Sequence, residues 1–156
     1  MRHISKKGTR MESGKHVIVR LGQELFGIPV LAVETILNDQ KVTRVPRAPK
    51  LLLGVFELRG RTLSAIDLRT RLEQPPFEGD AKHVVVDTPV GSVSIRVDKV
   101  EGIWEFDDVE PSESLLSCHD QFLSGIGKRG GVLVTILDPQ HLLSDQLKKK
   151  LAAQAA

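Results

Sequence analysis

The chain has 156 residues, 40% of them hydrophobic, which suits one compact domain or two small subdomains. It has no long apolar run and its basic start lacks an apolar segment, so we expect neither a membrane span nor a secretory signal. A single cysteine, Cys118, excludes an internal disulfide framework, and these features together favour a cytoplasmic protein.

The formal net charge of +2 is unevenly distributed. Residues 1–15 carry +4 and residues 145–156 carry +2, so residues 16–144 carry −4 (2 − 4 − 2). Nucleic-acid binders usually have a basic face on the folded part of the chain. We therefore expect no nucleic-acid partner.

The first half of the chain is predicted to begin with a flexible basic tail, residues 1–14. Residues 17–21 and 25–30 have the composition of strands around a glycine turn. Residues 41–49 contain two prolines and are predicted to form a loop. Residues 54–66 read as a hairpin that turns at Arg59 and Gly60.

The second half repeats this plan after a proline-rich linker at residues 73–82. It contains predicted strands, a polar loop and a leucine-spaced amphipathic helix. In chain order these are the strands at 84–87 and 92–97, the loop at 107–121, the strands at 125–131 and 132–137, and the C-terminal helix at 145–156.

The two halves are related by an internal repeat. At an offset of 67, His16 falls on His83 and Glu34 falls on Glu101; at an offset of 71, Gly54 falls on Gly125. A repeat of this length predicts two similar units packed together. Short strands joined by glycine-rich turns indicate an all-β fold with one small barrel for each copy.

No group of residues converges on catalysis. Cys118 and His119 are adjacent, so their side chains point apart in an extended loop. The histidines lack metal-ligand spacing, and the equivalent Asp67 and Asp138 are better explained as helix caps. We therefore expect no enzyme activity, no metal and no cofactor. The few aromatic residues also argue against a polyproline-binding groove.

Arg59 is the most distinctive charged residue of the first copy. It lies at a predicted hairpin turn, and its counterpart in the second copy is Gly130. It is either a solvated turn residue or an arginine that a rigid turn presents to a partner.

Five motifs occur in the order found in the CheW-like chemotaxis coupling proteins, and over residues 15–144 the chain resembles that family. The motifs are Phe26-Gly27-Ile28, Val33-Glu34-Thr35-Ile36, Val45-Pro46-Arg47-Ala48-Pro49, Gly54-Val55-Phe56-Glu57-Leu58-Arg59-Gly60 and Ile66-Asp67-Leu68-Arg69.

The resemblance implies an all-β fold of two SH3-like five-stranded β-barrels with short helices, over approximate subdomains 15–74 and 82–144, with exchange of strands left open. It implies a non-enzymatic adaptor that couples the cytoplasmic tip of a chemoreceptor to the regulatory domain of a CheA-type histidine kinase, in receptor arrays at the membrane. It also implies a receptor-facing groove between the barrels. The expected groove residues are Val33, Ile36, Gly54, Arg59 and Val100.

Two positions depart from the family pattern. Thr35 stands where the family has a glutamate, and Glu57 stands where it has an asparagine. The glutamate would be the expected partner of the hairpin arginine, so we expect Glu57 to orient Arg59 in its place. These departures leave open a specialised pathway, such as pilus motility or development, in which the protein acts as an inhibitor or localisation factor.

The equivalent loops of the two copies have opposite charge. Residues 38–53 carry +3 and include Arg44 and Arg47, whereas residues 105–121 carry −6 and include Asp107 and Asp108. Such loops either are simply solvated or steer head-to-tail contacts between successive barrels, building rings with the kinase. A small β-barrel enzyme and a basic-tailed nucleic-acid binder remain as competing classes.

Overall fold

The computed structural model describes residues 14–112 and 120–143, so most of the predicted tail, Cys118–His119 and the predicted C-terminal helix lie outside the described residues. The first half contains β1 (Lys15–Leu21), β2 (Glu24–Pro29), η1 (Val30–Ala32), β3 (Val33–Asn38), β4 (Leu52–Leu58), β5 (Arg61–Asp67) and α2 (Leu68–Arg71). The second half contains β6 (Lys82–Thr88), β7 (Gly91–Val97), β8 (Lys99–Glu105), β9 (Asp108–Pro111), β10 (Leu123–Arg129), β11 (Val132–Leu137) and η3 (Pro139–His141).

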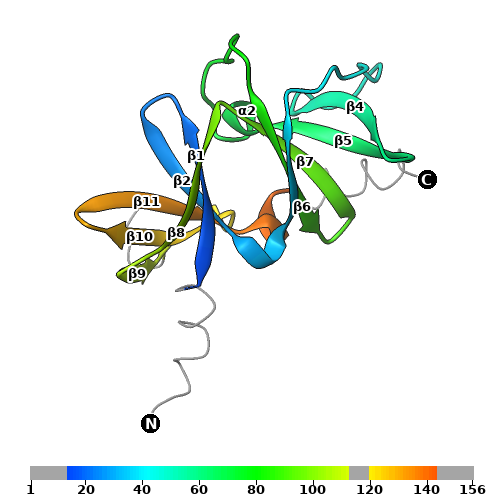
Figure 1. Cartoon of the computed structure of the whole chain (residues 1–156). Helices are drawn as coiled ribbons and strands as arrows, with labels where there is room; N and C mark the ends of the chain where they lie inside the picture. Colours follow the sequence, from blue (N-terminus) through cyan, green and yellow to red (C-terminus); the bar gives the residue numbers. More distant parts are fainter. Residues whose placement is uncertain (1–13, 113–119, 144–156) are drawn as a thin grey trace.

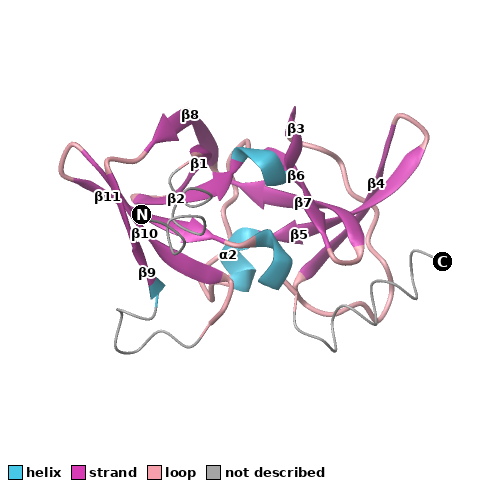
Figure 2. Ribbon diagram, turned by 90° about the horizontal axis from the view of Figure 1, so that it is seen from below, coloured by secondary structure: helices cyan, strands magenta, loops and turns pink. Residues whose placement is uncertain are grey.

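These strands form two sheets that lie side by side (Figure 1). The first sheet has the order β8-β1-β2-β11-β10-β9, and the second has the order β3-β6-β7-β5-β4. The all-β fold with two units is therefore confirmed, with six strands in the first sheet and five in the second. Short helices lie between the sheets when the molecule is seen from below (Figure 2).

Each sheet contains strands from both copies of the repeat. The offsets match β1, β2 and β3 with β6, β7 and β8, and they match β4 and β5 with β10 and β11. Each copy therefore contributes its first two strands to one sheet and its remaining strands to the other. The exchange of strands left open by the sequence is the arrangement present in the fold.

The repeat extends to the register of individual residues. Val17 pairs with Ile28 between β1 and β2, and the equivalent residues Val84 and Ile95 pair between β6 and β7. The strand pairs β3–β6 and β1–β8 both have an irregular register, at the equivalent glutamates Glu34 and Glu101. An irregularity of this kind bends an edge strand and re-aims its side chains.

Three hydrophobic clusters hold the sheets. The largest joins residues of both sheets, including Val19, Ile28 and Ile95, and a smaller cluster lies within each sheet around Ile18 or Val85. In β1 and β6 the apolar residues are buried on both strand faces, whereas burial alternates along β3 and β8 because they are sheet edges. The shared cluster makes the two sheets one folding unit.

Candidate binding surfaces

Arg59 occupies the two-residue turn between β4 and β5, as the sequence predicts. Its φ is 50°, and Gly60 follows at 82°; the equivalent residues Gly130 and Gly131 have φ values of 53° and 83°. This left-handed region suits glycine and is unfavourable for other residues. The first copy therefore holds an exposed arginine in a left-handed conformation, at a position where the second copy has a glycine that adopts this conformation without strain.

The apolar residues predicted for the groove lie on the two edge strands β3 and β8. Val33 and Val100 pack against the largest hydrophobic cluster, which the two sheets share, and are half-buried. Ile36 pairs with Val84 of that cluster and is 42% exposed. Its counterpart on β8, Ile103, is 58% exposed and was missed by the sequence analysis, although the offset of 67 points to it.

Gly54 is buried and holds the loop that precedes β4 close to the strand. A Cβ atom at this position would lie 2.3 Å from the carbonyl oxygen of Thr43, and its φ is 152°. Thr43 exchanges two backbone hydrogen bonds with Val55, at 2.7 and 2.8 Å. Gly54 is thus required by backbone packing, and it presents no side chain to a partner.

Glu57 does not form the pair with Arg59 that the sequence analysis proposed. Both side chains are exposed, and among the described residues no ion pair joins them. Arg61 instead contacts Glu34 of β3 at 3.3 Å, and Ser92 also donates to this carboxylate. These contacts tie the β4–β5 hairpin to β3. Thr35 pairs with Val85, whose side chain lies in the cluster within the second sheet.

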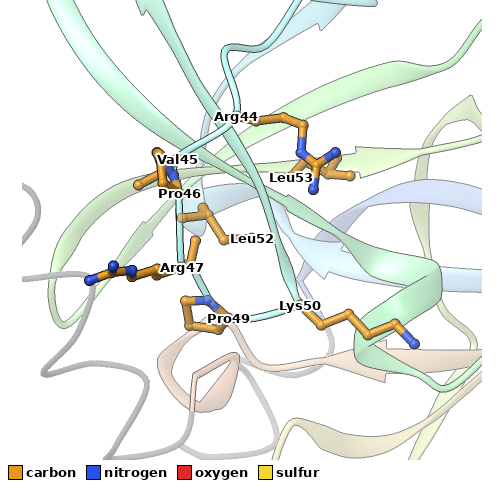
Figure 3. Close-up of a pocket in the computed structure, with 9 residues that line it drawn as sticks. Arg44, Val45, Pro46, Arg47, Pro49, Lys50, Leu52 and Leu53 are labelled. Carbon is orange, nitrogen blue, oxygen red and sulfur yellow. The ribbon is translucent and has the colours of Figure 1, made fainter.

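The basic loop of residues 44–53 lines a pocket of ≈ 390 Å³ (Figure 3). Arg44, Arg47 and Lys50 contribute its cations, and Arg47 and Lys50 extend to opposite sides of the loop. Arg47 has a φ of 64°. Val45 and Leu52 are among the apolar residues that line the pocket, so the pocket is both cationic and apolar.

The cations without a contact to another described residue gather in this region. Most described lysines and arginines form a hydrogen bond, an ion pair or a ring contact within the chain. The described cations without such a contact are Lys15, Lys41, Arg44, Arg47, Lys50, Arg59 and Lys99. All of these except Lys15 and Lys99 lie between residues 41 and 59.

The acidic stretch of the second copy is partly neutralised within the chain. Lys128 contacts both Asp108 and Glu110, and Arg71 contacts Asp120 at 2.8 Å. Asp107 accepts the N–H of Gly130 at 3.0 Å. Asp107 and Asp108 are exposed, yet both have contacts within their own chain.

A serine, a histidine and an aspartate do come together, in a structural role. Nδ1 of His83 lies 2.9 Å from Ser94, and Nε2 lies 3.1 Å from Asp39. His83 and Ser94 have no exposed surface, and Arg96 also binds Asp39. Burial would raise the pKa of Asp39, but the bonds from Arg96, Ala81 and His83 outweigh it and lower this pKa to about 2. The array is closed to any substrate.

Residues 14–112 and 120–143 contain no group of three or more histidine, cysteine, aspartate or glutamate side chains able to hold a metal ion. Within the same part of the chain, no helix is long and apolar enough to cross a membrane.

Comparison with known proteins identifies the fold and the family. The model of the CheW-like domain matches residues 15–147. The chemotaxis protein CheW of Helicobacter pylori is 32% identical over 145 residues, covering 87% of each chain, and that of Klebsiella aerogenes is 30% identical over 148 residues, covering 92% of this chain and 89% of the relative. The crystal structure of the scaffolding protein TtCheW from Thermoanaerobacter tengcongensis has the same fold, with a TM-score of 0.78 at 23% identity, and it covers 86% of this chain and 95% of that one. The match of the family model to residues 15–147, together with relatives at least 30% identical along most of both chains, shows that this chain belongs to the CheW-like domain family.

Proposed function

We propose that this protein is a chemotaxis scaffold that couples chemoreceptors to a CheA-type histidine kinase without catalysing a reaction. This function is supported by the match to the CheW-like domain across residues 15–147. It is also supported by the similarity to curated chemotaxis proteins, which this chain matches along most of their length. The alternative, an inhibitor or localisation factor of a specialised pathway, has no comparable support.

The receptor would bind along β3 and the β4–β5 hairpin. Val33 and Ile36 on the second sheet, with Val100 and Ile103 on the first sheet, supply apolar surface for one face of a receptor helix. Arg59 would meet a polar group at the rim. Its left-handed backbone supports this role, because strained residues concentrate at functional sites.

The kinase regulatory domain would contact the basic loop through Arg44 and Arg47. Head-to-tail assembly into rings at the receptor array would follow if Asp107 and Asp108 faced the basic loop of a neighbouring CheW-like domain. The cations of the first copy are available for this contact. The two aspartates would have to share their existing contacts with the neighbour.

A pull-down with a receptor cytoplasmic fragment and the kinase tests this function. Wild-type protein is expected to retain both partners, and Arg59→Ala is expected to lose receptor while keeping kinase. Thr62→Ala, an exposed position on the same hairpin that is not assigned to either partner, serves as the control. A wild-type protein that retains neither partner would contradict the coupling function, whereas an unchanged Arg59→Ala would contradict only the site assignment.

A further inference from the structure

The outer edge of β4 is open along part of its length, whereas the equivalent edge of β10 is covered. On β10, β9 pairs from Pro111 opposite Gly125 to Asp108 opposite Lys128. On β4 the corresponding contact is a single bridge between Thr43 and Val55.

The open part of this edge can be located from the hydrogen bonds. Both backbone groups of Val55 bond to Thr43, so they point away from β5. Backbone direction alternates along a strand, so the N–H and C=O of Glu57 point the same way. The equivalent Lys128 has its C=O bonded to the N–H of Asp107 at 2.7 Å. Among the described residues, none bonds to the outward backbone groups of Glu57.

Unpartnered cations border this open edge from end to end. Lys50 precedes β4, Arg59 follows it, and Arg44 is next to the residue that bridges Val55. The basic pocket lies at the same edge, with Leu52 and Leu53 of β4 in its lining (Figure 3). The apolar hollow therefore lies at the start of β4 and the free backbone groups lie at Glu57, with the Thr43–Val55 bridge and Arg44 between them.

The second copy provides a precedent for what fits such an edge. The strand that covers β10 is Asp108-Val109-Glu110-Pro111, in which carboxylates alternate with an apolar residue. Val109 packs on the cluster within the first sheet, and the carboxylates contact Lys128. An added strand gains affinity from main-chain bonds and specificity from alternate side chains.

We propose that the open edge of β4 binds an extended acidic segment of a partner protein. The segment adds a short strand at Glu57, continues past Arg44 along the basic loop with its carboxylates against Arg44 and Arg47, and seats an apolar side chain in the pocket. This inference rests on the proposed function, because it names the chemistry that the same basic loop recognises in a partner.

A labelled synthetic peptide with the sequence of residues 105–112 is a suitable probe, because it has four carboxylates and the alternation of β9. We expect saturable binding to the full chain, weakened about tenfold by Arg44→Glu/Arg47→Glu and by raising salt from about 0.05 to 0.5 M. The same peptide with its carboxylates changed to amides is expected not to bind. Equal binding of the amide peptide, or of the charge-reversed protein, would overturn the proposal.

A second pair of variants tests strand addition separately from charge. Glu57→Pro removes the outward N–H, and Glu57→Ala removes the same carboxylate but keeps the N–H. We expect Glu57→Pro to bind the peptide about fivefold more weakly than Glu57→Ala, with thermal unfolding confirming that both fold. Equal affinities would contradict strand addition.

The receptor and kinase pull-down separates this inference from the function on which it rests. Protein that retains both partners but ignores the peptide contradicts only the acidic-segment proposal. Protein that binds the peptide but retains neither partner contradicts the coupling function and supports an acidic-segment site on β4.

Discussion

The two copies of the repeat share their strands and registers but differ in the residues that border them. Some differences place a carboxylate in a contact within the chain. Asp98, which binds Arg69, stands where the first copy has the exposed Leu31, and Asp39, which binds His83, stands where the second copy has Phe106. Others are exposed, as in the basic loop around Arg44. A difference between copies therefore indicates a binding function only where its charge lacks a partner within the chain.

The largest loss of stability is expected from breaking a buried ion pair whose aspartate occurs in only one copy. Asp98 is 5% exposed and accepts bonds from Arg69 and from the N–H of Gly22. Arg69→Ala would leave that carboxylate without its cation, and we expect a loss of about 3–5 kcal/mol of unfolding free energy in denaturant titration.

Two controls sharpen this prediction. Arg20→Ala breaks the half-exposed pair with Glu101 and is expected to cost about 0–1 kcal/mol. Adding Asp98→Leu to Arg69→Ala, which introduces the residue of the first copy, should recover part of the loss. Similar costs for Arg69→Ala and Arg20→Ala would show that the buried pair has no special role.

Gly54→Ala tests the position at which both copies need close backbone approach. The added Cβ would clash with the carbonyl of Thr43, so we expect destabilisation of about 3 kcal/mol. This corresponds to a fall in Tm of about 6–12 °C in calorimetry. Gly60→Ala, whose Cβ would meet no atom of the described residues within 4 Å, controls for backbone strain alone. An unchanged Tm for Gly54→Ala would mean that the loop moves freely away from β4.

The equivalent buried histidines make stability depend on pH. Burial lowers the pKa of His16 and of His83, against the opposing bonds to Gly14 and Asp39. Their folded pKa values lie below the unfolded value, so their contribution is complete above pH 6.5 and is lost as the pH falls toward the folded pKa.

The pH dependence can be measured by denaturant titration between about pH 7.5 and 5. We expect a loss of at most about 1.4 kcal/mol per pH unit for each histidine. His16→Leu should remove the contribution of His16 to this pH dependence, and it breaks no bond at Nε2, which has no hydrogen-bond partner among the described residues. The same slope in wild type and His16→Leu would exclude His16 as a source.

The smallest expected effect separates strain from function at Arg59. Arg59→Gly introduces the residue of the second copy and relieves the left-handed backbone, so we expect a gain of up to about 1 kcal/mol. Receptor binding should fall even though stability rises. If Arg59→Gly bound the receptor normally, Arg59 would have no role in receptor binding and would be only a strained turn residue.

Residue patterns were sufficient to predict the all-β class, the duplication and the hairpin turn at Arg59. They did not predict β9, because its acidic alternation reads as a polar loop and its pairing with β10 depends on distant residues. The role proposed for Glu57 rested on two residues of an extended strand sharing a face, whereas Arg59 turns out of the strand at φ 50°. Ile103 was recoverable from the repeat itself. The internal partners of the acidic loop required the three-dimensional contacts.

The central claim is that the unpartnered cations of the basic loop carry a binding function that unpartnered cations elsewhere in the chain do not. Calorimetric titration of the CheA-type kinase regulatory domain tests it most directly, comparing Arg44→Glu/Arg47→Glu with Lys15→Glu/Lys99→Glu, which makes the same charge change at unpartnered cations outside the loop. We predict affinity about tenfold weaker for the loop variant and within about twofold of wild type for the control, with the difference shrinking as salt rises. Equal affinities for the two variants at low salt would contradict the account.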